Sequence, residues 1–175
     1  MYLANISNFN NTKDYLPIIT GALIVDLVII LLAVISIINS KSLNNWYNQF
    51  GPCAVLADVL SIVIGIILAR FLYPFIFKKY SLLQFLFLTV LIQITHDLLF
   101  AILFNSIPRG NSNILDVFKD YALEVGFKIL LIDAAMMIST IILSSYLSKF
   151  NSNTIIILFI IMLYISPYLL YSIKK

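Results

Sequence analysis

The stretch LPIITGALIVDLVIILLAVISII, residues 16–38, decides the fold class of this chain. It contains a single charged residue, Asp26, and it is longer than the roughly 20 apolar residues that cross a bilayer as a helix. The residues before it are polar and rich in asparagine, and they lack the basic start and the cleavage site of a signal peptide. We therefore predict that this segment is retained as a transmembrane helix.

The composition of the whole chain extends this prediction. Of the 175 residues, 62% are hydrophobic and 11% are charged, whereas about 25% of the residues in a soluble domain are charged. We predict an all-α integral membrane bundle of about five transmembrane helices, which forms a single transmembrane domain over residues 1–175. The expected spans are residues 16–38, 53–73, 81–104, 126–147 and 154–171, and residues 114–125 form an amphipathic segment at the interface.

Two connecting segments complete this picture. Residues 39–51, which contain aromatic side chains among asparagines, are predicted to form a loop in the headgroup zone. Asn113 is a suitable N-cap for the amphipathic segment. We expect that helix to continue through Gly126 into the fourth span, because Glu124 and Lys128 have the favourable i,i+4 order.

Several classes of function are excluded by what the sequence lacks. A net charge of +3 without a basic stripe argues against nucleic acid as a partner. The single cysteine, Cys53, excludes an internal disulfide and a cysteine-rich metal site. The sequence contains no glycine-rich phosphate loop, GxSxG, HExxH or dinucleotide fingerprint, so we expect neither an enzyme nor a bound cofactor.

Acidic residues inside the spans are the most informative feature. Of eight acidic residues, Asp26, Asp58, Asp97 and Asp133 lie within expected spans. A charge at the bilayer centre costs about 2.5–3.5 kcal/mol, so such residues face a bundle interior or a water-filled cavity. At 1.5 Å per residue, Asp58 lies about 9 Å, Asp97 about 5–7 Å and Asp133 about 5 Å from the midpoint of its span, all toward one side. Asp26 lies near the midplane.

Polar neighbours extend this acidic group. His96 is the only histidine, and helical spacing places either it or Asp97 on the same face as Gln93. Lys128 is placed to reach toward Asp133 from the membrane surface. We expect the second, third and fourth spans to form the core, and Arg70 to extend to the opposite surface. The candidate site comprises Asp26, Asp58, Gln93, His96, Asp97, Lys128 and Asp133.

The residues alone leave four interpretations of this cluster open. It is a structural hydrogen-bond network, a proton or cation pathway, a metal site that joins His96 to carboxylates, or a catalytic carboxylate pair. No nucleophile with a base and an orienting group accompanies the carboxylates, so the last interpretation names no reaction. For the metal interpretation, the sequence does not identify which metal the site would hold.

Three stretches resemble uncharacterised multi-pass membrane proteins of giant DNA viruses of algae and protists. They are QITHDLLF (93–100), IPRGNSNILDVFKDYALEVGFK (107–128) and LLIDAAMM (130–137). The shared features are a His-Asp pair, an IP-x-G-x-N turn, a DxFKxYAxExG helix and an Asp in the next apolar stretch. Here the asparagine that follows the turn is split between Asn111 and Asn113, which departs from that pattern.

This resemblance implies a location in the internal membrane of a virus particle, or in the host membrane from which that membrane is built. It also implies contacts with capsid or other membrane proteins. We expect a non-enzymatic component of a membrane assembly whose partner is the lipid bilayer. The alternative is a small proton- or cation-conducting channel or transporter that uses the intramembrane carboxylates and His96. The sequence leaves open a homo-oligomer with a site between subunits.

Overall fold

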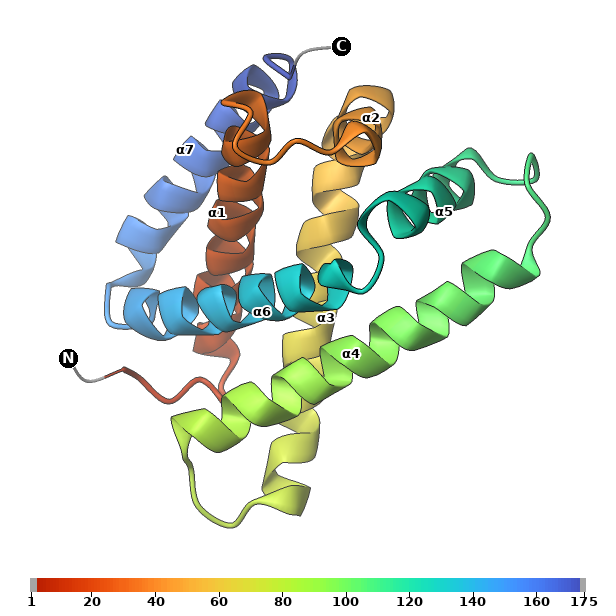
Figure 1. Cartoon of the computed structure of the whole chain (residues 1–175). Coiled ribbons are helices and arrows are strands. Elements are labelled where there is room, and N and C mark those ends of the chain that lie inside the picture. The colour runs from red at the N-terminus through yellow and green to blue at the C-terminus, as the bar shows by residue number, and fades with distance from the viewer. Residues whose placement is uncertain (1–2, 174–175) are drawn as a thin grey trace.

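The computed structural model describes residues 3–173, and all of the regular structure in this range is helical (Figure 1). The predicted all-α class is therefore confirmed. After a short 3-10 turn η1 (Thr12–Asp14), the helices are α1 (Tyr15–Val34), α2 (Lys41–Phe50), α3 (Pro52–Ile76), α4 (Leu82–Ser106), α5 (Asn113–Val125), α6 (Lys128–Leu147) and α7 (Ser152–Leu170).

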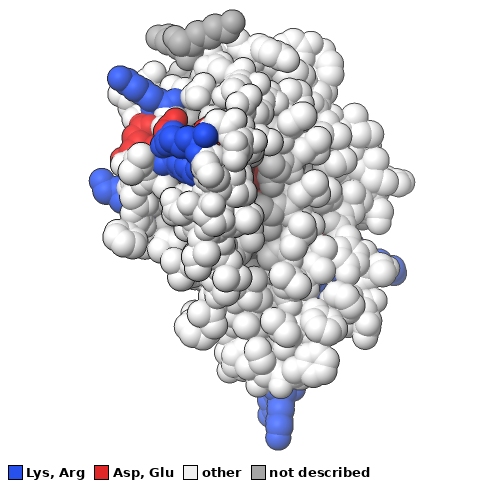
Figure 2. All heavy atoms as spheres, turned by 90° about the vertical axis from the view of Figure 1, so that its right-hand side faces the viewer, with Lys and Arg blue, Asp and Glu red and all other residues white. Residues whose placement is uncertain are grey.

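Five helical segments are long and apolar enough to cross a membrane, as the sequence predicts. They are α1 with its preceding turn, α3, α4, α6 and α7. On the face drawn in Figure 2, charged side chains form one cluster at the upper left, a few basic ones lie at the lower end and the edges, and the broad remaining surface is uncharged. The chain is thus consistent with a multi-pass integral membrane protein. The first span lies nearer the N-terminus than expected, because the helix ends at Val34, after which Ser36 adopts a φ of 61°.

The centre of the bundle is α1. It packs against α3, α6 and α7. Of the residues in its most apolar stretch, 56% are buried, compared with 17% in the corresponding stretch of α4. In Figure 1, α4 and α6 run obliquely across the upright helices α1, α3 and α7. The expectation that the second to fourth spans form the core is therefore wrong, because the first span lies between them and α7.

Small residues allow α6 to cross α1 closely. A Cβ atom added to Gly21 of α1 would lie 2.5 Å from Ser144 Oγ and 3.3 Å from the backbone oxygen of Thr140. Both α6 residues are fully buried. Such contacts between small side chains hold transmembrane helices together where apolar burial from water cannot.

The predicted loop at 39–51 is instead the helix α2. Its N-cap is Ser40, whose hydroxyl accepts a hydrogen bond from the backbone N–H of Leu43. The helix is amphipathic, and Trp46 and Tyr47 are buried while the next residue, Asn48, is exposed. Ten residues are too few to span a bilayer, so α2 lies at one end of the bundle.

The predicted continuous helix through Gly126 is also wrong. Gly126 has a φ of 62°, which ends α5 and lets α6 begin in a new direction. The carboxylate of Glu124 does not extend along α6 toward Lys128. It accepts hydrogen bonds of 2.8 Å from the backbone N–H groups of Lys41 and Ser42 at the start of α2.

These two hydrogen bonds tie α5 to α2. Burial tends to raise the pKa of Glu124, but the hydrogen bonds from Ser42 and Lys41 outweigh it and hold the pKa below its ordinary value. The N-cap of α5 is Ser112 rather than the predicted Asn113, and its hydroxyl accepts from Leu115 N–H. Together α2 and α5 cover one end of the bundle.

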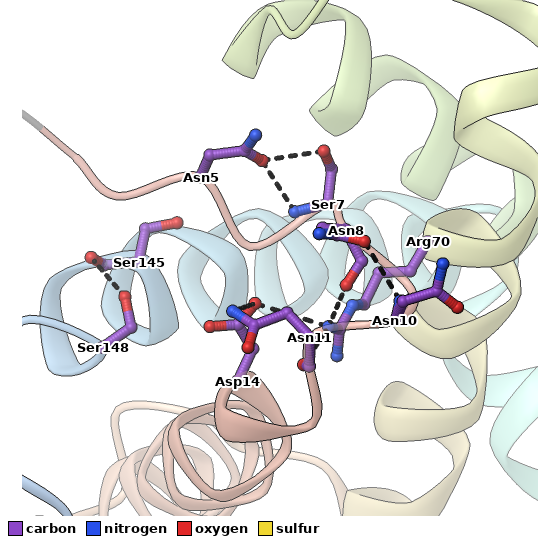
Figure 3. Close-up of polar contacts among 9 residues, drawn as sticks. All are labelled: Asn5, Ser7, Asn8, Asn10, Asn11, Asp14, Arg70, Ser145 and Ser148. Atoms are coloured by element: carbon purple, nitrogen blue, oxygen red, sulfur yellow. Dashed lines mark hydrogen bonds and ion pairs between the residues drawn. The ribbon is translucent and has the colours of Figure 1, made fainter.

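The opposite end is closed by the N-terminal segment. Arg70, predicted to extend to the surface, is fully buried. Its Nη2 donates to the backbone oxygens of Asn8 and Asn11, and it lies 3.4 Å from the Asp14 carboxylate (Figure 3). The guanidinium also lies 4.6 Å from the centre of the Tyr15 ring. The prediction failed because the polar residues before α1 fold back over the end of α3 and supply the partners of this arginine.

Candidate functional site

A cavity of about 730 Å³ lies beneath α2 and α5. Its walls come mainly from α2, α3, α4, α5 and α6, with Ile29 of α1 and Ile38 after it, and most of its lining is apolar. Asp58 of α3, Asp97 of α4 and Asp133 of α6 each reach it. We call this cavity the acidic chamber. The structure thus brings together the three carboxylates that the sequence placed in one half of the membrane.

The α4 wall contributes a connected set of polar groups. Gln93 Nε2 donates a 2.7 Å hydrogen bond to Asp97 Oδ1, and His96 Nδ1 lies 3.2 Å from the same oxygen. The second oxygen of Asp97 is buried and has no hydrogen-bond partner among the residues that the structure describes. The half-exposed His96 ring stacks on Phe100 with an interplanar angle of 10°. Asp97 therefore presents an unpaired carboxylate oxygen next to a titratable imidazole.

The α2 wall connects two carboxylates. Trp46 Nε1 donates a 2.9 Å hydrogen bond to Asp58 Oδ2, and the Tyr47 hydroxyl donates a 3.0 Å bond to Asp26 Oδ1. Burial raises the pKa of Tyr47 well above its ordinary value, and the nearby charges of Asp26 and Asp58 raise it further. The fully buried Asp26 does not line the acidic chamber. It lies behind the wall, with Tyr47 between it and the cavity.

The α6 wall contributes Asp133, which is half-buried and lies close enough to Asp97 and Asp58 for their charges to interact with its own. Tyr121 of α5 faces the same carboxylates. Burial, followed by the charges of Asp133 and Asp58, raises the pKa of Tyr121 to about 12. Its hydroxyl therefore stays protonated near neutral pH.

Lys128 does not join this group. It is exposed at the start of α6 and is not among the residues that line the acidic chamber. The expectation that it reaches toward Asp133 is thus wrong, because the break at Gly126 starts a new helix and turns the lysine outward. The positive charge expected beside the acidic group is missing from the chamber lining.

Aromatic rings form much of the remaining wall. The ring centres of Trp46 and Phe118 are 4.8 Å apart, and those of Phe100 and Phe118 are 4.9 Å apart. Sequence reasoning missed Trp46, Tyr47 and Tyr121 as site residues. The signal for the first two was the spacing of Trp46, Tyr47 and Phe50, which places aromatic groups on one face of a short helix.

The metal interpretation receives no geometric support. Over residues 3–173, no three or more His, Cys, Asp or Glu side chains are grouped closely enough to hold a metal ion. His96 contacts a single carboxylate, Asp97.

No protein-family model, curated protein or solved structure matches this chain.

Proposed function

We propose that this multi-pass membrane protein binds a cation in the acidic chamber and carries it within the membrane. The observation that carries this proposal is the convergence of Asp58, Asp97 and Asp133, from three different helices, on one cavity. None of the described residues lining that cavity is Lys or Arg. Carboxyl groups removed from water must be neutralised by protons or by a cation. Apart from His96, which lies 3.2 Å from Asp97, the described lining has no basic side chain, and three carboxylates with so little counter-charge favour a cationic ligand.

The packing below the chamber favours a carrier over an open pore. Between the chamber and the Arg70 end of the bundle, the interior is filled by apolar side chains that are fully buried, among them Ile66, Phe85 and Met137. Gly65 lies against Met137 at the same level, which leaves little free space there. A cation that enters the chamber therefore meets a closed apolar core, and passage requires a conformational change.

Flux measurements in liposomes test this function. We expect saturable uptake of protons or small organic cations by the wild-type protein, and loss of most of that uptake in Asp97→Asn and Asp133→Asn. Asparagine keeps the shape and most hydrogen bonds while it removes the charge. The matched control is Asp120→Asn, because Asp120 is exposed on α5, pairs with Arg109 and does not line the chamber. Absence of flux in folded wild-type protein overturns the carrier proposal, as does full flux in both chamber variants.

A second candidate function is that of a component of a membrane assembly. The observation that favours it is the pair Leu123 and Phe127 at the α5–α6 junction, which are 80% and 88% exposed and lie outside the long apolar helices. They offer an apolar contact to another subunit, to a capsid protein or to a second copy of the chain. In this proposal the membrane is the internal membrane of a giant virus particle, as the sequence resemblance implies.

A photo-crosslinking amino acid at position 127 tests this second function. We expect a discrete protein adduct at position 127 in the native membrane and none at position 83, because Leu83 is similarly exposed but lies within α4. Lipid adducts alone at both positions would count against an assembly role.

A further inference from the structure

A second cavity of about 820 Å³ lies between α1 and α6. Figure 1 shows these two helices crossing. The lining is aliphatic apart from Ser139 and Tyr146, and it contains no charged residue in the part of the chain that the structure describes. We call it the α1–α6 groove, and it is lined by Leu3, Ile24, Val25, Val28, Ile29, Ile38, Ile132, Ala135, Met136, Ser139, Ile142, Leu143 and Tyr146.

The α1–α6 groove adjoins the acidic chamber. Four side chains, those of Ile29, Ile38, Ile132 and Met136, line both cavities. The boundary between the two spaces is therefore a layer of aliphatic side chains. Three of these residues are isoleucines, which are stiff at χ1, and Met136 is the flexible one.

The dimensions suit a hydrocarbon chain. Along α6 the groove extends from Ile132 to Tyr146, which is about 21 Å at 1.5 Å per residue. One leaflet of a bilayer contributes about 15 Å of hydrocarbon, half of a core of about 30 Å. The groove is thus long enough to hold an extended lipid-like tail along one side of the bundle.

The acidic chamber suits the head group of such a molecule. Its carboxylates attract a positive charge, and the faces of Trp46, Phe100 and Phe118 can stabilise an ammonium group by cation–π contact. Its volume of about 730 Å³ lies in the range of sites for small organic ligands and far exceeds that of a bare ion. Charge and size together favour an organic ammonium group.

We infer that the chain binds a single-chain cationic amphiphile. Its ammonium head lies among Asp58, Asp97 and Asp133 in the acidic chamber, and its tail lies in the α1–α6 groove. This inference rests on the proposed function and specifies the substrate class. It also specifies the route, because a molecule whose tail follows the groove enters sideways from the bilayer.

The only tryptophan of the chain, Trp46, lines the acidic chamber and reports on binding. The probe is dodecyltrimethylammonium brominated on the carbons next to its head group, added to the protein in phosphatidylcholine nanodiscs. We expect saturable quenching of Trp46 fluorescence, with half-saturation at a concentration about tenfold lower than for a brominated dodecyl alcohol, equivalent to about 1.4 kcal/mol. The alcohol has the same tail and no charge, so the difference between the two probes measures the contribution of the ammonium group.

Variants separate the head site from the tail site. Asp133→Asn and, independently, Asp97→Asn should each weaken binding about tenfold, whereas Asp120→Asn should leave it unchanged. Ala135→Phe fills part of the α1–α6 groove and should weaken binding of the amphiphile without affecting tetramethylammonium, measured as a competitor. Two chamber variants are used so that a folding defect in one leaves the test intact.

Two results would overturn the inference in different ways. If tetramethylammonium competes as strongly as dodecyltrimethylammonium, the chamber binds cations but the tail and the groove play no part, and the proposed function survives. If the alcohol and the ammonium quench equally in wild type and in both chamber variants, the chamber has no preference for cations. The inference and the proposed function then fail together.

Discussion

Replacement of Gly21 by alanine tests the close crossing of α1 and α6. Helix α6 also contributes Asp133 to the acidic chamber. The added Cβ would lie 2.5 Å from Ser144 Oγ, closer than real side chains approach. Overpacking of this kind costs about 1–3 kcal/mol. The better helix propensity of alanine returns about 1 kcal/mol. We therefore expect a net loss of up to about 2 kcal/mol in the free energy of unfolding.

The second variant in this test is Ser144→Ala. The hydroxyl of Ser144 has no hydrogen-bond partner among the described residues, so its loss costs little. With the Oγ atom gone, the nearest atoms to the new Cβ are Thr140 O at 3.3 Å and Ser144 N at 3.4 Å. These contacts need shifts of only a few tenths of an ångström. The double variant should therefore recover most of the stability that Gly21→Ala loses.

The assay is reversible unfolding in detergent micelles with increasing dodecyl sulfate, followed by Trp46 fluorescence. The control is Gly65→Ala, whose Cβ would meet Met137 Cε at 2.9 Å, the movable end of a flexible side chain. It should cost less than Gly21→Ala, because the better helix propensity of alanine offsets the small shift of that methyl group. A stable Gly21→Ala variant, or a double variant that is no more stable than Gly21→Ala, would refute the close crossing.

Three further predictions concern the ends of the bundle and the α2 wall. Tyr47→Phe removes the donor to Asp26, which should cost about 1–3 kcal/mol in the same unfolding assay; an unchanged stability would contradict that contact. Arg70→Met leaves Asp14 buried without its partner and should cost about 3–5 kcal/mol, with partial recovery on adding Asp14→Asn. Because the pKa of Glu124 is lowered in the folded chain, its ionised carboxylate stabilises the α2–α5 contact at pH values above the ordinary pKa of 4.5. This stabilisation is lost as the pH falls through the lowered pKa. Trp46 emission should therefore shift to the red in acid, and Glu124→Gln should abolish that shift; a shift that persists in the variant would contradict it.

The five long helices were predictable because length and hydropathy alone identify them. The centre of the bundle was not, because a span surrounded by protein and a span surrounded by lipid are equally apolar. The residues that place α1 at the centre are small ones such as Gly21, whose partner Ser144 lies far away in the sequence. Nothing in the sequence indicates which helix this serine meets.

The grouping of Asp58, Asp97 and Asp133 agrees with their predicted depth, because the rise of a helix is the same in any bundle. The errors lie where the chain leaves regular spans. The short helix α2 was predicted as a loop, so the Trp46 contact to Asp58 and the Tyr47 contact to Asp26 were missed. The position of Lys128 depended on whether the helix continues through Gly126 or ends there. Gly126 has a φ of 62°, which ends the helix, and this conformation is visible only in the folded chain.

The distribution of charge along α3 explains why the acidic chamber lacks a counter-charge of its own. Arg70 is the buried cation of this helix, and it lies twelve residues after Asp58, about 18 Å away at 1.5 Å per residue. Its Nη2 is already engaged by Asn8, Asn11 and Asp14 at the opposite end of the bundle. The Asp58 carboxylate instead accepts a hydrogen bond from the uncharged indole N–H of Trp46. Among the described lining residues His96 alone is basic, so in the proposed function the remaining positive charge is supplied by the bound cation.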